Sequence, residues 1–592
     1  MAESFNNLVE LFEKSCDKFA SKELFGTKTA DGWSWMTYGA FRTRVDAFRS
    51  ALAAMGVGAG DRVAIVSDNR VEWAVAAYAT YGRRASYIPM YEAQKPDEWE
   101  FILADSGCKV VIGSKKEIYE KLLKVQPNVP GLERVIGIDL PDDHVDGFPK
   151  LLADGAKTPL KSEHPGSEEI AGLIYTSGTT GKPKGVILSH GNLCSNVNAI
   201  HSIFTFESDD RSLSFLPWAH SFGQTVELHG LLSMGASMAI NDDIPSLLPN
   251  LATVKPTILF AVPRIFNRVY DNLNKQMAER PAMVRNLFHT AVAAKIAESG
   301  GKSLGIGDRI AVALAEKLVF TKVRERLGGR LKYAVSGSAA LNKDVASFID
   351  ALGIQVYEGY GLTETSPIAT ANFPGNRKIG SVGKAIPLVR IAIDTSVTGD
   401  EKNGEILVYG PNVMQGYHNR QEETQQVLMG DGGFRTGDMG QIDPDGFLYI
   451  TGRIKEQYKL ENGKYVVPSP LEEEAKLSPL IANIMLHGAN KPYNVALVVP
   501  DKAALEKWAA DAGVSLTDAE TNPKVAELLV GEIKKYGKGF KSYERPEKVV
   551  VTMEDFTTEN GMLTPTMKLK RRSVLQKYEP QLDALFGAPG RE

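Results

Sequence analysis

The side chains best suited to phosphate chemistry are concentrated in residues 175–186, YTSGTTGKPKGV. This segment holds three glycines, four Ser or Thr hydroxyls and two lysines, and it follows an apolar run at 171–174 that predicts a buried strand. Such a loop can turn tightly and surround an anion with backbone N–H groups and hydroxyls. A Gly/Ser/Thr cluster alone is more often a flexible surface loop. The density and the two lysines favour a polyphosphate cradle.

Three better-known motifs are excluded by their context. The cradle is not a P-loop, because Lys182 is followed by Pro183 where Ser or Thr should open a helix. Residues 56–60, GVGAG, lie between a predicted helix and the next strand, which is the wrong order for a dinucleotide fingerprint. Residues 301–305 satisfy GxSxG, but they lie in a polar loop between two predicted helices, so a serine hydrolase is rejected.

Other candidate side chains follow predicted strands, where open α/β sheets bind ligands. His220 ends the segment LSFLPWAH, although a lone histidine is more often structural. Tyr360, Thr363 and Glu364 follow a strand at 354–357 and offer a ring for a base, a hydroxyl for a phosphate and a carboxylate for Mg²⁺. Alone, this loop would be a glycine turn with a capping threonine and a solvated glutamate.

Four further motifs follow the cradle in order, across about 400 residues: GYGLTET at 359–365, RTGDM at 435–439, TGRIKE at 451–456 and ENGMLTPTMKLKRR at 559–572. Together they resemble the adenylate-forming superfamily, which contains acyl-CoA synthetases, luciferases and the adenylation domains of peptide synthetases. Residues 255–273 and a helical insert at about 281–327 resemble the long-chain fatty acyl-CoA synthetase branch in particular.

This resemblance implies that the chain binds ATP with Mg²⁺ and uses coenzyme A as a cosubstrate. Lys568 would bridge the substrate carboxylate and the α-phosphate, Thr363 would contact phosphate, Glu364 would bind Mg²⁺ and His220 would line the acyl pocket. Tyr360 would face adenine. The remaining implied nucleotide contacts are Thr176, Ser177, Gly178, Thr179, Thr180, Lys184, Gly337, Gly361, Asp438 and Arg453.

Two of these assignments have local alternatives. An aspartate such as Asp438 in a TGD turn is commonly only a turn former, whereas the resemblance gives it the ribose hydroxyls. Residues 559–572 could be a solvated edge strand. Met567 stands where many relatives have glycine, so Lys570 is an alternative to Lys568 as the catalytic lysine.

The resemblance also implies a domain rotation between two half-reactions. Lys455 is the hinge residue by register, and the loop Asn462, Gly463 and Lys464 would approach the acyl carbonyl when CoA attacks. Asn462 replaces the first residue of a Gly-Gly pair that many relatives have, a variant similar to the long-chain branch.

The implied reaction is ATP-dependent activation of a fatty acid to acyl-AMP and its transfer to CoA, giving long-chain acyl-CoA, AMP and pyrophosphate. One alternative is a fatty acyl-AMP ligase that delivers to a carrier protein, and another is a medium-chain or aryl acid:CoA ligase. A non-enzymatic acyl- or AMP-binding scaffold is disfavoured, because every residue type that the chemistry needs is present.

The elements that must position these residues predict an α/β fold. At 592 residues the chain is too long for one core. Short apolar runs alternate with helical patterns from 61 to 138, which predicts a parallel sheet with helices on both faces. We expect an N-terminal domain over 1–452, with a β-rich subdomain at about 380–450, and a small mobile α/β domain over 453–592.

Composition limits the partners and the location. A net charge of −4 gives no reason to expect nucleic-acid binding, and three widely spaced cysteines indicate neither a disulfide framework nor a zinc site. The N-terminus predicts an amphipathic helix rather than a secretory signal, so we expect a cytoplasmic protein. Peripheral contact at the inner membrane face, through Lys534, Lys535, Lys538 and Lys541, competes with a plain solvated basic face. The oligomeric state, monomer or homodimer, is left open.

Overall fold

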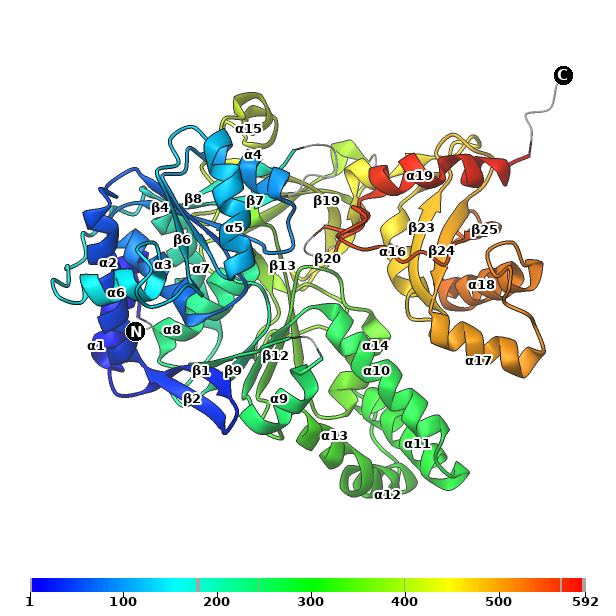
Figure 1. Ribbon diagram of the computed structural model, residues 1–592. Helices are drawn as coiled ribbons and strands as arrows, with labels where there is room; N and C mark the ends of the chain where they lie inside the picture. The colour runs from blue at the N-terminus through cyan, green and yellow to red at the C-terminus, as the bar shows by residue number, and fades with distance from the viewer. Residues whose placement is uncertain (1–2, 177–181, 244, 399, 565–566, 588–592) are drawn as a thin grey trace.

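The computed structural model describes residues 3–176, 182–243, 245–398, 400–564 and 567–587. Figure 1 shows a large N-terminal part and a smaller C-terminal part, drawn in yellow to red. This arrangement confirms the predicted α/β fold with a large and a small domain.

The first large sheet carries the cradle and has seven strands. Its central strands are parallel, and strands such as β3 and β5 are apolar runs buried on both faces, as all-parallel sheets require. The strand order is β18 (Gly416–Tyr417), β8 (Lys184–Ser189), β7 (Ile170–Thr176), β4 (Ser86–Met90), β3 (Arg62–Val66), β5 (Val110–Gly113) and β6 (Arg134–Gly137). The strands predicted between 61 and 138 are confirmed.

The second large sheet has nine strands, with a parallel centre and antiparallel edges. In order they are β15 (Lys384–Ala385), β14 (Ile368–Ala371), β13 (Val356–Gly361), β12 (Tyr333–Ser336), β11 (Ile258–Ala261), β9 (Arg211–Ser214), β10 (Ser237–Ile240), β1 (Glu23–Thr29) and β2 (Gly32–Thr37). The carboxyl ends of β9, β12 and β13 lead into the predicted site segments.

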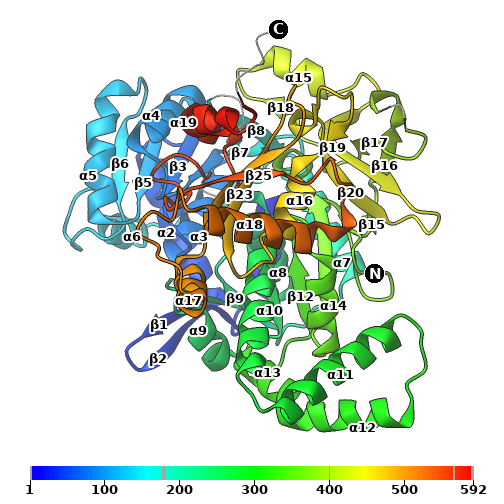
Figure 2. The same cartoon turned by 90° about the vertical axis from the view of Figure 1, so that its right-hand side faces the viewer.

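Helices cover and join these two sheets (Figures 1 and 2), and one continuous apolar core includes residues from both sheets. α3 is buried along its whole length, and a Ser189–Asn192 capping box starts α7. The helices are α1 (Leu8–Lys18), α2 (Tyr38–Ala54), α3 (Val71–Tyr81), α4 (Pro96–Ser106), α5 (Lys116–Val125), α6 (Phe148–Gly155), α7 (His190–Ile203), α8 (Gly230–Met234), α9 (Leu247–Val254) and α14 (Lys343–Ala351). A π-helix, η2 (Phe222–His229), was not predicted from the sequence.

The β-rich subdomain is a four-stranded antiparallel sheet in the order β16 (Arg390–Asp394), β17 (Gly404–Tyr409), β19 (Gly433–Ile442) and β20 (Leu448–Arg453). The short helix α15 (Gln421–Val427) lies between β18 and β19 in sequence. The predicted boundary between residues 452 and 453 falls at the last residue of β20.

The helical insert predicted at about 281–327 consists of α11 (Ala282–Ser299), α12 (Ile306–Ala315), η3 (Glu316–Phe320) and α13 (Thr321–Arg326), and α10 (Pro263–Ala278) precedes it. It projects from the nine-stranded sheet and forms the lower limit of the molecule in both views (Figures 1 and 2). The GxSxG match lies in the loop between α11 and α12, so the rejection of a nucleophile elbow is confirmed.

The C-terminal part is built on the sheet β23 (Ile481–His487), β24 (Val495–Pro500) and β25 (Lys548–Val551), with a small hairpin, β21 (Tyr458–Lys459) and β22 (Tyr465–Val466). Its helices are α16 (Pro468–Ala475), α17 (Lys502–Ala512), α18 (Pro523–Tyr536) and α19 (Arg571–Ala584). The edge-strand alternative for 559–572 is wrong: Leu563 and Leu569 form one isolated bridge, and Arg571 begins α19. None of the described helices is both long enough and apolar enough to cross a bilayer.

Candidate active site

The described ends of the predicted phosphate cradle belong to two paired strands. Thr176, at the end of β7, and Lys184, at the start of β8, face each other across the antiparallel pair. A P-loop would open a helix at this point. Ser177, Gly178, Thr179 and Thr180 lie outside the described residues. Thr176 and Lys184 thus fix both ends of the candidate loop at the edge of the seven-stranded sheet.

Glu364 and Lys184 lie on either side of a tyrosine that the motif analysis did not single out. The Tyr417 hydroxyl donates to Glu364 Oε1 at 2.8 Å, and the Lys184 ammonium lies 5.1 Å from the centre of the Tyr417 ring. Lys184 Nζ is also 4.0 Å from Glu423. Burial and the Glu364 carboxylate raise the pKa of Tyr417, so it stays a neutral donor. Tyr417 therefore joins the cradle to the predicted Mg²⁺ ligand.

Asp438 is buried, and each of its carboxylate oxygens has a partner. The Tyr360 hydroxyl donates to Oδ2 at 2.9 Å, and Arg453 Nε lies 2.9 Å from Oδ1. The Asp438 charge is the largest cause of the raised pKa of Arg453. Asp438 faces Arg453 across β19 and β20, so the strand register holds the ion pair in place. This is more than a turn-forming role.

The loop around Tyr360 depends on glycine. A Cβ added to Gly361 would lie 1.7 Å from the Pro367 carbonyl oxygen, so only glycine allows the chain to pass there. After Gly361, the short turn η4 (Thr363–Thr365) carries Thr363 and Glu364. The Thr363 hydroxyl is buried and lies 3.3 Å from that of Ser221. The tight turn brings the 359–365 motif against the segment that holds His220.

His220 lies in the turn between β9 and η2, at the edge of the site. Its Nδ1 accepts from the Phe222 backbone N–H at 3.2 Å, which leaves the ring proton on Nε2. Burial lowers the pKa of His220 to about 4, and Lys568 contributes further. Gly337, after β12, also belongs to this edge, because an added Cβ would lie 3.2 Å from the Phe222 ring. His220 is a neutral hydrogen-bond donor near pH 7.

Lys568 reaches this cluster from the far end of the chain. Its pKa is lowered, first by partial removal from bulk water and then by Arg453, while Asp438 and Glu364 oppose the shift. Lys568 keeps more than a third of its surface accessible, so it is not sealed in a core. Among the described residues no ion pair or hydrogen bond holds its ammonium.

Lys570 has different neighbours from Lys568. It helps to line a small crevice of about 40 Å³ with Lys95 and Glu98 of the N-terminal part, and its backbone N–H donates to the Met562 carbonyl. The charges that act on Lys568 are those of Arg453, Asp438, Glu364 and Glu456, which belong to the candidate site and the turn after it.

The residues predicted for the second half-reaction are not gathered here. Lys455 is exposed on η6 (Ile454–Glu456), the turn that follows β20. Asn462, Gly463 and Lys464 are exposed at the tip of the β21–β22 hairpin, where Lys464 lies over the Tyr543 ring. The C-terminal part itself supports this tip, since the Asn490 N–H donates to the Lys459 carbonyl.

A third ion cluster joins the hinge turn to the tail that carries Lys568. Arg571, the first residue of α19, pairs with the buried Glu472 of α16, and its Nε lies 4.0 Å from Glu456. No sequence motif singled out this cluster, Tyr417 or Ser221. Arg571 lies three residues after Lys568 in the same basic run, which is the one signal that could have drawn attention to it.

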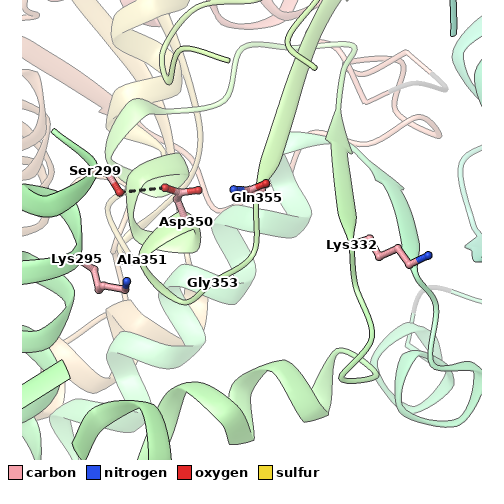
Figure 3. Close-up of a pocket in the computed structure, with 7 residues that line it drawn as sticks. All are labelled: Lys295, Ser299, Lys332, Asp350, Ala351, Gly353 and Gln355. Carbon is pink, nitrogen blue, oxygen red and sulfur yellow. Dashed lines mark hydrogen bonds between the residues drawn. The ribbon is translucent and has the colours of Figure 1, made fainter. Parts of the chain in front are cut away.

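A surface depression of about 380 Å³ lies elsewhere, lined by α11 of the helical insert and by the segment from α14 to β13 (Figure 3). Its charged groups already have partners: Lys332 pairs with Glu207 and Asp210, and Asp350 pairs with Arg377. None of the predicted site residues lines it, so the convergent cluster, not this depression, is the candidate active site.

Comparison with known proteins gives the same assignment. The model of the "AMP-binding enzyme" family matches residues 12–418, and the model of the "AMP-binding enzyme C-terminal domain" matches residues 455–589. The chain belongs to the AMP-binding enzyme family. The predicted membership of the adenylate-forming superfamily is thereby confirmed.

Among AMP-binding enzymes, curated relatives bear long-chain names. "Long-chain-fatty-acid–CoA ligase FadD15" of Mycobacterium bovis is 34% identical over 94% of this chain and 92% of its own length. "Long chain acyl-CoA synthetase 7, peroxisomal" of Arabidopsis thaliana is 32% identical over 97% of this chain and 85% of its own. These relatives confirm that the chain is nearest to the long-chain branch.

Solved AMP-binding enzymes share the fold. The A-PCP didomain of carboxylic acid reductase from Segniliparus rugosus, in complex with AMP, has a TM-score of 0.79 at 22% identity and covers 98% of this chain and 82% of its own. ATP-bound MatB from Rhodopseudomonas palustris has a TM-score of 0.72 at 25% identity and covers 97% of this chain and 100% of its own.

Proposed function

We propose that this enzyme is an AMP-forming long-chain fatty acid–CoA ligase. One observation carries the adenylation step: Lys568, from the last fifth of the chain, lies in the electrostatic field of Asp438, Glu364 and Arg453. The long-chain assignment rests on the curated relatives, which match nearly the whole chain.

A carboxylate is a poor electrophile, because its charge repels nucleophiles and oxide is a poor leaving group. Its attack on the α-phosphate of ATP replaces the oxide with AMP and releases pyrophosphate. Two anions must therefore approach each other, and a cation between them lowers the barrier. Lys568 would provide this charge on a flexible stem, and His220 would donate its Nε2 proton to an acceptor oxygen.

The residues at the site suit ATP and Mg²⁺. Buried Asp438 and the partly exposed Arg453 form an ion pair that could exchange hydrogen bonds with ribose hydroxyls. Glu364 uses Oε1 to accept from Tyr417, and no hydrogen bond to Oε2 is found among the described residues. A carboxylate oxygen is a ligand that Mg²⁺ prefers. When bound, Mg²⁺ would neutralise phosphate charge and favour departure of pyrophosphate.

In the second half-reaction the thiol of CoA displaces AMP, and the Lys568 charge is no longer needed at that place. We infer that the C-terminal part, over 453–592, rotates about Lys455 and brings Asn462, Gly463 and Lys464 to the acyl carbonyl. The present arrangement favours the adenylation state: its TM-score is 0.72 to ATP-bound MatB and 0.62 to apo MatB.

The test supplies purified enzyme with ATP, Mg²⁺ and saturated fatty acids of increasing length, with and without CoA. We expect pyrophosphate release with long chains, and acyl-CoA and AMP as products when CoA is present. Each buried methylene contributes about 0.8 kcal/mol, so kcat/KM should rise with chain length until the pocket is filled. Release of no pyrophosphate with any carboxylate would overturn the proposal.

The same assay separates the alternatives. Acyl-AMP that forms but never reaches CoA indicates a fatty acyl-AMP ligase that serves a carrier protein. An optimum at short or aryl acids indicates a medium-chain or aryl ligase. The membrane contact through Lys534, Lys535, Lys538 and Lys541 stays a prediction, and so does the cytoplasmic location.

A further inference from the structure

The outer face of the helical insert exposes an apolar stripe that the fold does not use. Ile306, Ile310, Leu314 and Leu318, called the α12 ridge below, follow one another at intervals of four residues along α12 and η3. Their side chains are 82%, 57%, 48% and 49% exposed. At 1.5 Å per residue the ridge is about 18 Å long. Large apolar side chains at this spacing form one continuous face, which is typical of an interaction surface.

Other side chains of α12, η3 and α13 pack into the protein core. Ala315, Val319, Phe320 and Val323 are buried in the core cluster of the nine-stranded sheet. The insert is therefore held in place without the α12 ridge. Substitutions on the ridge should leave the fold intact, since exposed positions contribute little to stability.

Basic side chains outnumber acidic ones around the α12 ridge. Lys302, Arg309, Lys317 and Lys322 are all exposed, and none of the four has an ion-pair partner among the described residues. Of the acids on α12, η3 and α13, Glu316 pairs with Arg324, which leaves Asp308 at the start of α12 and Glu325 on α13 against the four basic residues. Unpaired basic side chains beside a row of exposed Ile and Leu suit an anionic lipid surface.

The position of the ridge allows contact with a flat surface. The insert forms the lower limit of the molecule in two views that differ by a rotation about the vertical axis (Figures 1 and 2). Met283, at the start of the neighbouring α11, is 83% exposed and adds an apolar side chain on the same insert.

We propose that the α12 ridge docks the enzyme on the surface of an anionic phospholipid bilayer. The apolar side chains enter the boundary between headgroups and acyl chains, and the four basic residues contact the headgroups. The mode is that of an interfacial helix that lies on the membrane and does not span it. The surface differs from the basic group at 534–541, which carries no comparable apolar row.

The test is sedimentation of the full chain, without substrates, with vesicles of phosphatidylcholine alone or mixed with phosphatidylglycerol. We expect binding to the mixed vesicles that weakens as salt rises. The double variant I310Q/L314Q should lose about tenfold or more in partition coefficient, because two large apolar side chains no longer enter the interface. For R309Q/K317Q, the partition coefficient should fall about fivefold for each residue replaced, and only on the mixed vesicles.

The matched control is L123Q/L248Q, which changes two leucines that are 41% and 50% exposed on α5 and α9. It should bind as the unaltered chain does. Thermal melts of all variants must coincide, which separates docking from unfolding.

The proposal is overturned if the unaltered chain binds neither vesicle at low salt, or if I310Q/L314Q binds as well as the control. It is also overturned if only K534Q/K535Q abolishes binding, which assigns docking to α18. If the unaltered chain binds no vesicle but forms a dimer that I310Q/L314Q dissociates, the α12 ridge binds a second copy of the chain and the proposal is overturned. Because no substrate is present, none of these outcomes depends on the proposed ligase activity.

Discussion

The two sides of the candidate site are built differently. On the N-terminal side, side-chain contacts hold each group: Asp438 between Tyr360 and Arg453, and Glu364 by Tyr417. On the C-terminal side, Lys568 is exposed and has no partner for its ammonium among the described residues. The groups of the first side are held in place by neighbours, whereas the charge on the second side is not. We expect substitutions on the first side to change mainly ATP affinity, and those on the second to change mainly the rate.

The substitution that tests this difference most severely is Lys568→Ala. Loss of a cation that stabilises the transition state should lower the adenylation kcat by about 10²–10³-fold. ATP affinity, measured by equilibrium binding, should change much less. Lys570→Ala is the matched control and should retain activity. An unchanged adenylation rate in Lys568→Ala would contradict the role given to Lys568, and would move that role to Lys570 if Lys570→Ala is inactive.

Substitution of Asp438 tests the binding side. Asp438→Asn keeps the shape but removes the charge that Arg453 faces and that ribose hydroxyls would use. We expect the KM for ATP to rise roughly 30- to 150-fold, equivalent to about 2–3 kcal/mol. The KM for the fatty acid should stay close to its original value. A fall in kcat at constant KM would contradict the proposed division.

Arg571 tests whether the tail must be held for Lys568 to work. Arg571→Met leaves the buried Glu472 without its ion-pair partner and frees the tail from Glu456. Breaking a buried pair costs about 3–5 kcal/mol of unfolding free energy. We expect a lower melting temperature and a roughly tenfold lower adenylation kcat, with the KM for ATP little changed. Arg572→Met, at an exposed neighbouring position, should alter neither, and Arg571→Lys should recover part of the rate.

Tyr417→Phe tests one hydrogen bond on the N-terminal side of the site. It removes the donor to Glu364 and keeps the ring beside Lys184. One hydrogen bond to a carboxylate is worth about 1–2 kcal/mol, so the Mg²⁺ concentration for half-maximal rate should rise about five- to thirtyfold. An unchanged Mg²⁺ requirement would show that Glu364 needs no orientation by Tyr417.

The smallest expected effect is a displacement of the pH profile. The pKa of Lys568 is lowered, so the active cation is lost at a pH below the usual value for lysine. The adenylation rate should therefore fall on the alkaline side below pH 10.5. Arg453 contributes to this lowering, so Arg453→Gln should raise the Lys568 pKa and move the limb to higher pH. Rate–pH profiles at saturating ATP measure the position of the alkaline limb. A limb that moves to lower pH in Arg453→Gln would contradict the effect of Arg453 on the Lys568 pKa.

Much of the fold could be predicted from local patterns. The helical patterns predicted between 61 and 138 are found as α3, α4 and α5, because apolar periodicity and capping act over a few residues. The π-helix at Phe222–His229 was missed, since its irregular turn gives no periodic signal and depends on what packs around it. The edge-strand alternative at 559–572 failed because a basic alternation also fits an irregular segment that leads into a helix.

The sequence by itself determined which chemistry is available: a glycine-rich anion loop, a carboxylate for a metal, an aspartate beside an arginine and a basic tail, all in the order that the family shares. Only the tertiary structure decided which groups meet. It brought Lys568 rather than Lys570 to Asp438, and it placed Tyr417 between Lys184 and Glu364. These partners are separated by tens to hundreds of residues, and the free energy of such contacts comes from sheet register and domain docking, which no local pattern encodes.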